Sequence, residues 1–94
     1  MTRIAMIAAL ALGLAAAATA QAQEALAKSG GCLNCHAIDG KKIGPSFKES
    51  AAKYKGQSDA EAMLLAKLAD STKHPATKAS PDDRAKLIKW ILSL

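Results

Sequence analysis

The chain is short and basic, which limits the functions it can have. It has 94 residues, a formal net charge of +5 at pH 7, and a single tryptophan, tyrosine and phenylalanine. The length predicts one domain. The charge is modest and no basic cluster alternates with aromatic residues, which argues against nucleic-acid binding.

The segment 1–22 has the layout of a secretory signal peptide. A short positive start precedes an apolar run over residues 4–18, and the small-residue pattern Ala20-Gln21-Ala22 follows. We expect cleavage after Ala22, with Ala20 as the alternative site. An uncleaved membrane anchor is the competing interpretation, but the apolar run is short of the ~20 residues that a bilayer span needs.

Cleavage would leave residues 23–94 as one small exported domain. This part of the sequence has no second apolar stretch long enough to cross a membrane, and its expected location is the periplasm of a Gram-negative bacterium. So small a chain usually needs a covalent or metal staple to hold its core together. A free pair of cysteines would face oxidation in such a compartment.

A short helix over residues 23–29 is expected to stop at Gly30-Gly31, and the motif Cys32-Leu33-Asn34-Cys35-His36 follows. This motif is the attachment site of a c-type haem. Each thiol adds across one vinyl group of the porphyrin, and one tight turn spans the two positions. The next residue then falls beneath the iron, where an imidazole can bind it. The sequence therefore predicts one covalent haem c, attached through Cys32 and Cys35, with His36 as an iron ligand.

Two further helices are predicted after this motif. Ser46 and Glu49 have the spacing of a capping box, and that helix is expected to end at Gly56. The same spacing recurs at Ser58 and Glu61, which predicts a third helix reaching about Ala69.

The last helix is expected to begin after Ser80, which is followed by proline and two acids. Its predicted apolar face consists of Leu87, Ile88, Ile91 and Leu92, with Trp90 beside it. Nothing in the chain alternates with a period of two, so the expected fold is all-α with about four helices. A thiol-redox or zinc protein is a weaker hypothesis, because there is no βαβ pattern and too few metal ligands.

The mature chain resembles the class I cytochromes c of the small bacterial type, the cytochrome c-551/c-552 family. The resemblance rests on four motifs: Cys32–His36, Gly44-Pro45, Tyr54-Lys55-Gly56 with the Ser58 cap, and Ser80–Trp90. The resemblance implies helices wrapped around one covalently attached haem. It also implies that the carbonyl of Pro45 accepts a hydrogen bond from the proximal imidazole.

One position departs from the family pattern. The family has a methionine, usually followed by proline, as sixth iron ligand at a fixed distance before the C-terminal tryptophan. That distance from Trp90 falls on His74-Pro75, so the resemblance implies His74 as the sixth ligand. Independently, a residue before proline is disfavoured in helices, which places His74 on an extended loop.

Other roles for this position stay open. The iron could instead have an open site for a small ligand, or His74 could be a surface histidine without a role. Met63 is the only methionine left after cleavage, but it lies within a predicted helix and methionine is a common core filler. Lys73 and Lys78 flank His74 and are protonated at neutral pH, which makes them poor ligands.

The leading hypothesis for function is a non-enzymatic electron carrier with a lower potential than His/Met relatives, because thioether ligation raises the potential. The alternative is a haem-based binder or sensor of a small gas with an open or displaceable sixth position. No triad, phosphate loop or carboxylate pair indicates an enzyme. Ten lysines from Lys41 to Lys89 would steer an acidic redox partner if they surround the haem edge, or form an ordinary solvated surface. We expect a monomer.

Overall fold

The computed structural model describes residues 19–94, and most of the predicted signal peptide, residues 1–18, lies outside them. The described part contains helices and no strand, which confirms the predicted all-α fold. Residues 19–29 are helical, so the first helix includes residues before the expected start at 23. The elements that follow are η1 (Cys32–Asn34), α2 (Phe47–Lys53), α3 (Ala60–Ala69) and α4 (Pro81–Leu92).

Two of the predicted helix caps are present. The hydroxyl of Ser46 accepts a hydrogen bond of 3.0 Å from the backbone N–H of Glu49, and Ser80 accepts one of 3.2 Å from Asp83. Pro81 occupies the first turn of α4, where its missing N–H costs nothing. Short-range sequence signals therefore fix the starts of α2 and α4.

The predicted cap at Ser58 is wrong. The N-cap of α3 is Asp59, whose side chain makes no capping hydrogen bond, and the helix begins at Ala60. The backbone N–H of Ala60 donates to the carbonyl of Gln57 at 3.2 Å. A backbone turn therefore satisfies this end of α3. The preceding helix also ends earlier than expected, at Lys53, with Gly56 in a left-handed turn beyond it.

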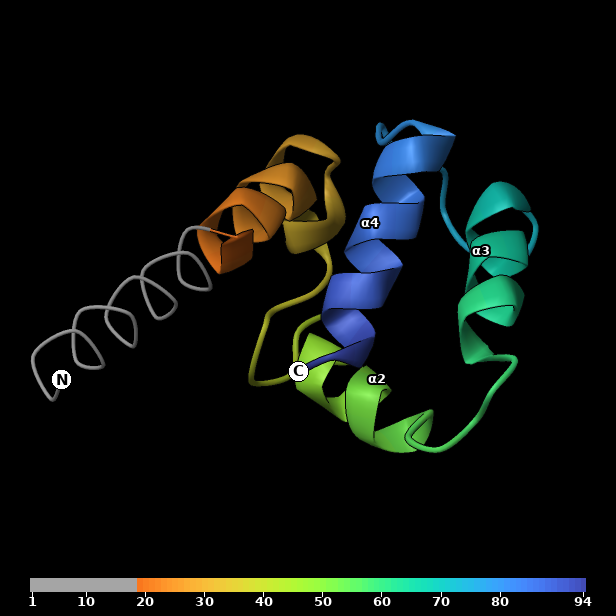
Figure 1. The fold of residues 1–94 in the computed structure, drawn as a ribbon. Coiled ribbons are helices and arrows are strands. Elements are labelled where there is room, and N and C mark those ends of the chain that lie inside the picture. Colours follow the sequence, from red (N-terminus) through yellow and green to blue (C-terminus); the bar gives the residue numbers. More distant parts are fainter. Residues whose placement is uncertain (1–18) are drawn as a thin grey trace, which may run out of the picture.

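The core forms where three segments meet on α4. Figure 1 shows α4 between α3 on one side and the helix of residues 19–29 on the other, with α2 near its C-terminal end. Ala27, Phe47 and Leu87 are buried together in this core. The rings of Phe47 and Trp90 meet edge to face, with centroids 5.8 Å apart. This packing fixes the end of the first helix, directly before the cysteine motif.

Within residues 19–94, no helix combines the length and the apolar character that a bilayer crossing requires.

Candidate haem site

The cysteine motif forms one tight turn at the end of the first helix. Gly31 adopts a left-handed conformation, with a φ of 82°, and starts η1. The backbone N–H groups of Cys35 and His36 both donate to the carbonyl of Cys32, at 3.3 and 3.0 Å. Both thiols are free and partly buried. The turn therefore brings Cys32, Cys35 and His36 together on one short segment.

The environment of Cys32 distinguishes it from a redox-active thiol. Its side chain packs against the buried core. Burial raises the pKa of the Cys32 thiol, and a backbone hydrogen bond lowers it by less. Reactive redox cysteines have a lowered pKa, because the thiolate is the nucleophile. Cys32 therefore lacks the lowered pKa that is typical of reactive redox cysteines.

His36 has its ring orientation fixed by the backbone of the following loop. Its Nδ1 lies 2.6 Å from the carbonyl oxygen of Pro45. A carbonyl only accepts hydrogen bonds, so Nδ1 carries the proton and Nε2 keeps a free lone pair. Such a hydrogen bond from the second ring nitrogen is usual for metal-binding histidines. The carbonyl of Pro45 is therefore the hydrogen-bond partner of the His36 ring.

Gly44 allows the loop to lie against the His36 ring. A Cβ at this position would come within 2.5 Å of Cε1 and 2.8 Å of Nδ1 of His36. Any side chain here would force the ring or the loop to move. Phe47 adds a second contact, with its ring centroid 5.5 Å from that of His36 and the planes at 27°. Backbone and aromatic contacts together restrict the proximal imidazole.

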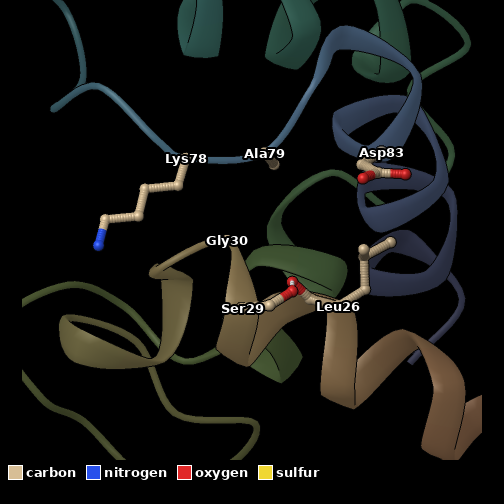
Figure 2. Close-up of a pocket in the computed structure, with 6 residues that line it drawn as sticks. All are labelled: Leu26, Ser29, Gly30, Lys78, Ala79 and Asp83. Carbon is tan, nitrogen blue, oxygen red and sulfur yellow. Dashed lines mark hydrogen bonds between the residues drawn. The ribbon is translucent and has the colours of Figure 1, made fainter.

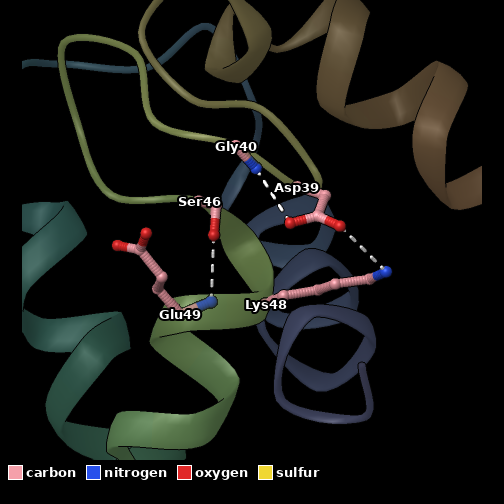
Figure 3. A network of polar contacts seen from close by, with 5 residues as sticks. All are labelled: Asp39, Gly40, Ser46, Lys48 and Glu49. Atoms are coloured by element: carbon pink, nitrogen blue, oxygen red, sulfur yellow. Dashed lines mark hydrogen bonds and ion pairs between the residues drawn. The ribbon is translucent and has the colours of Figure 1, made fainter.

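The loop that carries Pro45 is tied down at both ends. The backbone N–H of Gly44 donates to the carbonyl of Cys35 at 2.8 Å, and that of Phe47 donates to the carbonyl of Ala37 at 2.9 Å. Figure 3 shows the polar contacts around this loop, in which Asp39 accepts from the N–H of Gly40 and pairs with Lys48 at 3.5 Å. Exposed ion pairs contribute little, about 0 to 1 kcal/mol. The backbone hydrogen bonds therefore hold the loop in place.

His74 lies opposite His36, although the two residues are far apart in the sequence. The ring centroids are 6.1 Å apart and the ring planes differ by only 3°. The Nδ1 of His74 lies 2.8 Å from the carbonyl oxygen of Pro75. By the same reasoning as for His36, Nδ1 carries the proton and Nε2 is free. Both imidazoles thus use a proline carbonyl in the same way.

The separation of the two ring centroids equals the separation expected for two imidazoles that share one metal ion. A transition-metal bond to imidazole is about 2 Å long and a ring nitrogen lies about 1 Å from the ring centroid, so two imidazoles sharing a metal have centroids about 6 Å apart. The observed 6.1 Å agrees with this value. Together with two thiols on one turn, the residues present fit a covalent haem.

The other candidate ligands are placed differently. Met63 stays within α3, where its backbone N–H donates to the carbonyl of Asp59, and the residue is 39% exposed. The backbone N–H of Lys78 donates to the carbonyl of Gly30 at 3.1 Å, beyond the His74 loop. The ring that pairs with His36 belongs to His74.

Sequence reasoning missed a turn that precedes His74. The Asp70 carboxylate accepts hydrogen bonds from the N–H and the hydroxyl of Thr72, at 2.9 and 2.6 Å. The hydrogen bond from the hydroxyl and then that from the N–H lower the pKa of Asp70, so it is ionised at neutral pH. An aspartate two residues before a threonine is a recognisable turn signal.

Comparison with known proteins identifies relatives of this chain. A model of the family described as cytochrome c matches residues 20–94. The chain is 40% identical to cytochrome c-551 of Pseudomonas aeruginosa over 87 residues, which cover 85% of this chain and 84% of the relative. Cytochrome c-552 of Hydrogenobacter thermophilus is 35% identical, with 78% and 82% covered. The crystal structure of the class 1 cytochrome MtoD from Sideroxydans lithotrophicus ES-1 superposes with a TM-score of 0.70 at 36% identity, covering 78% of this chain and 92% of that one.

Proposed function

Because this chain belongs to the cytochrome c family, we propose that it carries single electrons on an iron held by His36 and His74. Members of this family bind one covalent c-type haem, and this chain has the two cysteines that attach it. When bound, the haem supplies an iron that cycles between ferrous and ferric states. Cys32 and Cys35 would attach the haem, and the loops that carry His36 and His74 would fix the two iron ligands.

Cys32 and Cys35 are the proposed attachment residues. They are the only cysteines of the chain, and they lie on the same turn as His36. Two covalent bonds would hold the haem in both oxidation states. Pro45 would keep the proximal Nδ1 protonated and Nε2 available for the iron.

The pairing of His36 with His74 is the observation that carries the proposed ligation. Parallel rings at a centroid separation of 6.1 Å, each with Nδ1 bound to a proline carbonyl, support the proposal that both imidazoles would hold the iron. Two imidazole ligands that stayed bound in both oxidation states would keep the structural change on electron transfer small. This favours a carrier over a catalyst.

The ligand pair also determines the proposed range of potential. Thioether ligation by methionine raises the potential of cytochromes c. A second imidazole in its place would give a lower potential than His/Met relatives have. We therefore place this chain in a lower-potential segment of an electron-transfer chain.

The proposed compartment is the periplasm. The motif of residues 20–22 and the apolar run before it support export and cleavage after Ala22. The partners would be redox proteins that approach the haem edge, where lysines of the mature chain would attract acidic surfaces. We propose that the mature chain, residues 23–94, acts as a monomer.

Optical spectra of the holoprotein, with and without carbon monoxide, test this function. We expect low-spin spectra in both oxidation states and slow carbon monoxide binding, because His74 occupies the sixth position. His74→Ala should bind carbon monoxide readily, whereas Met63→Leu should keep the wild-type spectrum. A high-spin wild type that binds carbon monoxide at once would favour a gas-binding protein instead.

A further inference from the structure

We propose that Asp70 is a positioning residue for His74, which it holds at the iron through the turn of residues 70–74. The proposal rests on the proposed ligation by His74 and adds the element that keeps this ligand bound. Asp70 is the residue that directly follows α3. His74 is the last residue of the turn.

The backbone and the side chain of Asp70 both organise this turn. Its carbonyl accepts hydrogen bonds from the N–H groups of Lys73 and His74, at 3.0 and 3.1 Å. Its carboxylate accepts two more from Thr72, at 2.9 Å from the N–H and 2.6 Å from the hydroxyl. Four hydrogen bonds therefore converge on one residue, and one of them comes from the backbone of His74 itself.

The turn follows directly from the end of α3, which is held against α4. The Arg84 guanidinium on α4 donates a hydrogen bond of 3.3 Å to the carbonyl of Leu68, near the end of α3. The α3 helix also packs along α4. Since these contacts hold the end of α3 against α4, the direction in which the chain leaves Asp70 positions His74.

The far end of the same loop is anchored separately. Figure 2 shows Lys78 and Ala79 passing over Gly30 at the end of the first helix. The N–H of Lys78 donates to the carbonyl of Gly30, and a Cβ on Gly30 would lie 3.2 Å from that of Ala79. Between the two anchors, the His74 ring is held by the carbonyl of its neighbour Pro75. On the N-terminal side of His74, the turn at Asp70 links it to the end of α3.

The rate of carbon monoxide binding to the ferrous holoprotein measures this role. At saturating carbon monoxide, the observed rate equals the rate at which His74 leaves the iron. Asp70→Ala should raise this limiting rate about tenfold, because two hydrogen bonds to the turn are lost. Asp70→Asn keeps an acceptor oxygen and should stay within about twofold of wild type.

Three matched variants separate positioning from general loss of stability. Thr72→Val should raise the rate by less than Asp70→Ala, because it removes only the hydroxyl. Ser71→Ala lies in the same turn and should leave the rate unchanged. In a His74→Ala background, Asp70→Ala should no longer affect the rate, since no ligand remains to be positioned.

Two results would overturn the positioning role of Asp70 but leave the ligation by His74 intact. One is a wild-type limiting rate in Asp70→Ala, even if its melting temperature falls. The other is an unchanged effect of Asp70→Ala in the His74→Ala background. A wild type that binds carbon monoxide as fast as His74→Ala would instead refute the ligation by His74, and the positioning role with it.

Discussion

The imidazole planes of His36 and His74 are parallel to within 3°, with their centroids 6.1 Å apart. Each ring donates from Nδ1 to a proline carbonyl, that of Pro45 or Pro75. These hydrogen bonds restrict rotation of both rings. The relative orientation of the imidazoles is therefore a property of the polypeptide.

This orientation predicts the electron paramagnetic resonance spectrum of the ferric protein. If both imidazoles bind the iron, parallel rings would interact with the same one of two iron d orbitals. This would separate the energies of the two orbitals. We expect a rhombic low-spin signal in frozen solution. A highly anisotropic signal, as crossed imidazoles give, would contradict the observed ring orientation, and His74→Ala should abolish the rhombic signal.

Covalent attachment is the second prediction. Extraction with acid and acetone should leave the haem with the polypeptide, because the thioethers of Cys32 and Cys35 survive denaturation. A protein expressed with haem maturation machinery should also show one added haem by mass spectrometry. Release of the haem into the solvent would refute attachment at these cysteines.

Removal of both attachment residues should destroy the fold. The buried core of the described chain is small and contains several alanines, among them Ala27 and Ala51. Without the apolar haem surface, a chain of this size lacks enough core to fold alone. Cys32→Ala with Cys35→Ala should therefore lose most helicity by circular dichroism. A cooperative melt with native-like helicity would show that the haem is not required.

Gly44→Ala should disturb the proximal ligand. The new Cβ would approach Cε1 of His36 to 2.5 Å, so the loop would have to move. We expect a loss of about 2 kcal/mol in the free energy of unfolding, as for other overpacked sites, together with a changed haem spectrum.

Gly40→Ala is the matched control for this variant. Gly40 has a φ of 81° and open space around it, so the substitution strains the backbone without touching His36. It should lower stability and leave the spectrum unchanged. Equal spectral changes in both variants would argue against a specific role of Gly44.

The sequence predicts the local features of this fold more accurately than its long-range contacts. Ser46 and Ser80 cap their helices as expected, because a cap depends on residues three positions apart. Ser58 has the same spacing, but a backbone turn at Gln57 replaces its cap. The competition between two local hydrogen-bonding patterns was not decided by residue spacing.

In the candidate site too, the local features could be predicted from the sequence and the long-range contacts could not. The turn of Cys32 to His36 and the contact of His36 with Pro45 were predicted from the motif and the family resemblance. The approach of His74 to His36 depends on how α3 and α4 pack, so its ring separation could not be read from the sequence. The Asp70 turn has a local signal, but only its position before His74 gives that signal a functional meaning.

The reduction potential of His74→Met, measured beside that of wild type, tests the central claim most directly. If His74 binds the iron, wild type should lack the near-infrared band that arises from sulfur-to-iron charge transfer. The variant should gain this band and have a higher potential, because a thioether favours the ferrous state. A wild type that already shows the band, or a potential that His74→Met leaves unchanged, would contradict ligation by two histidines.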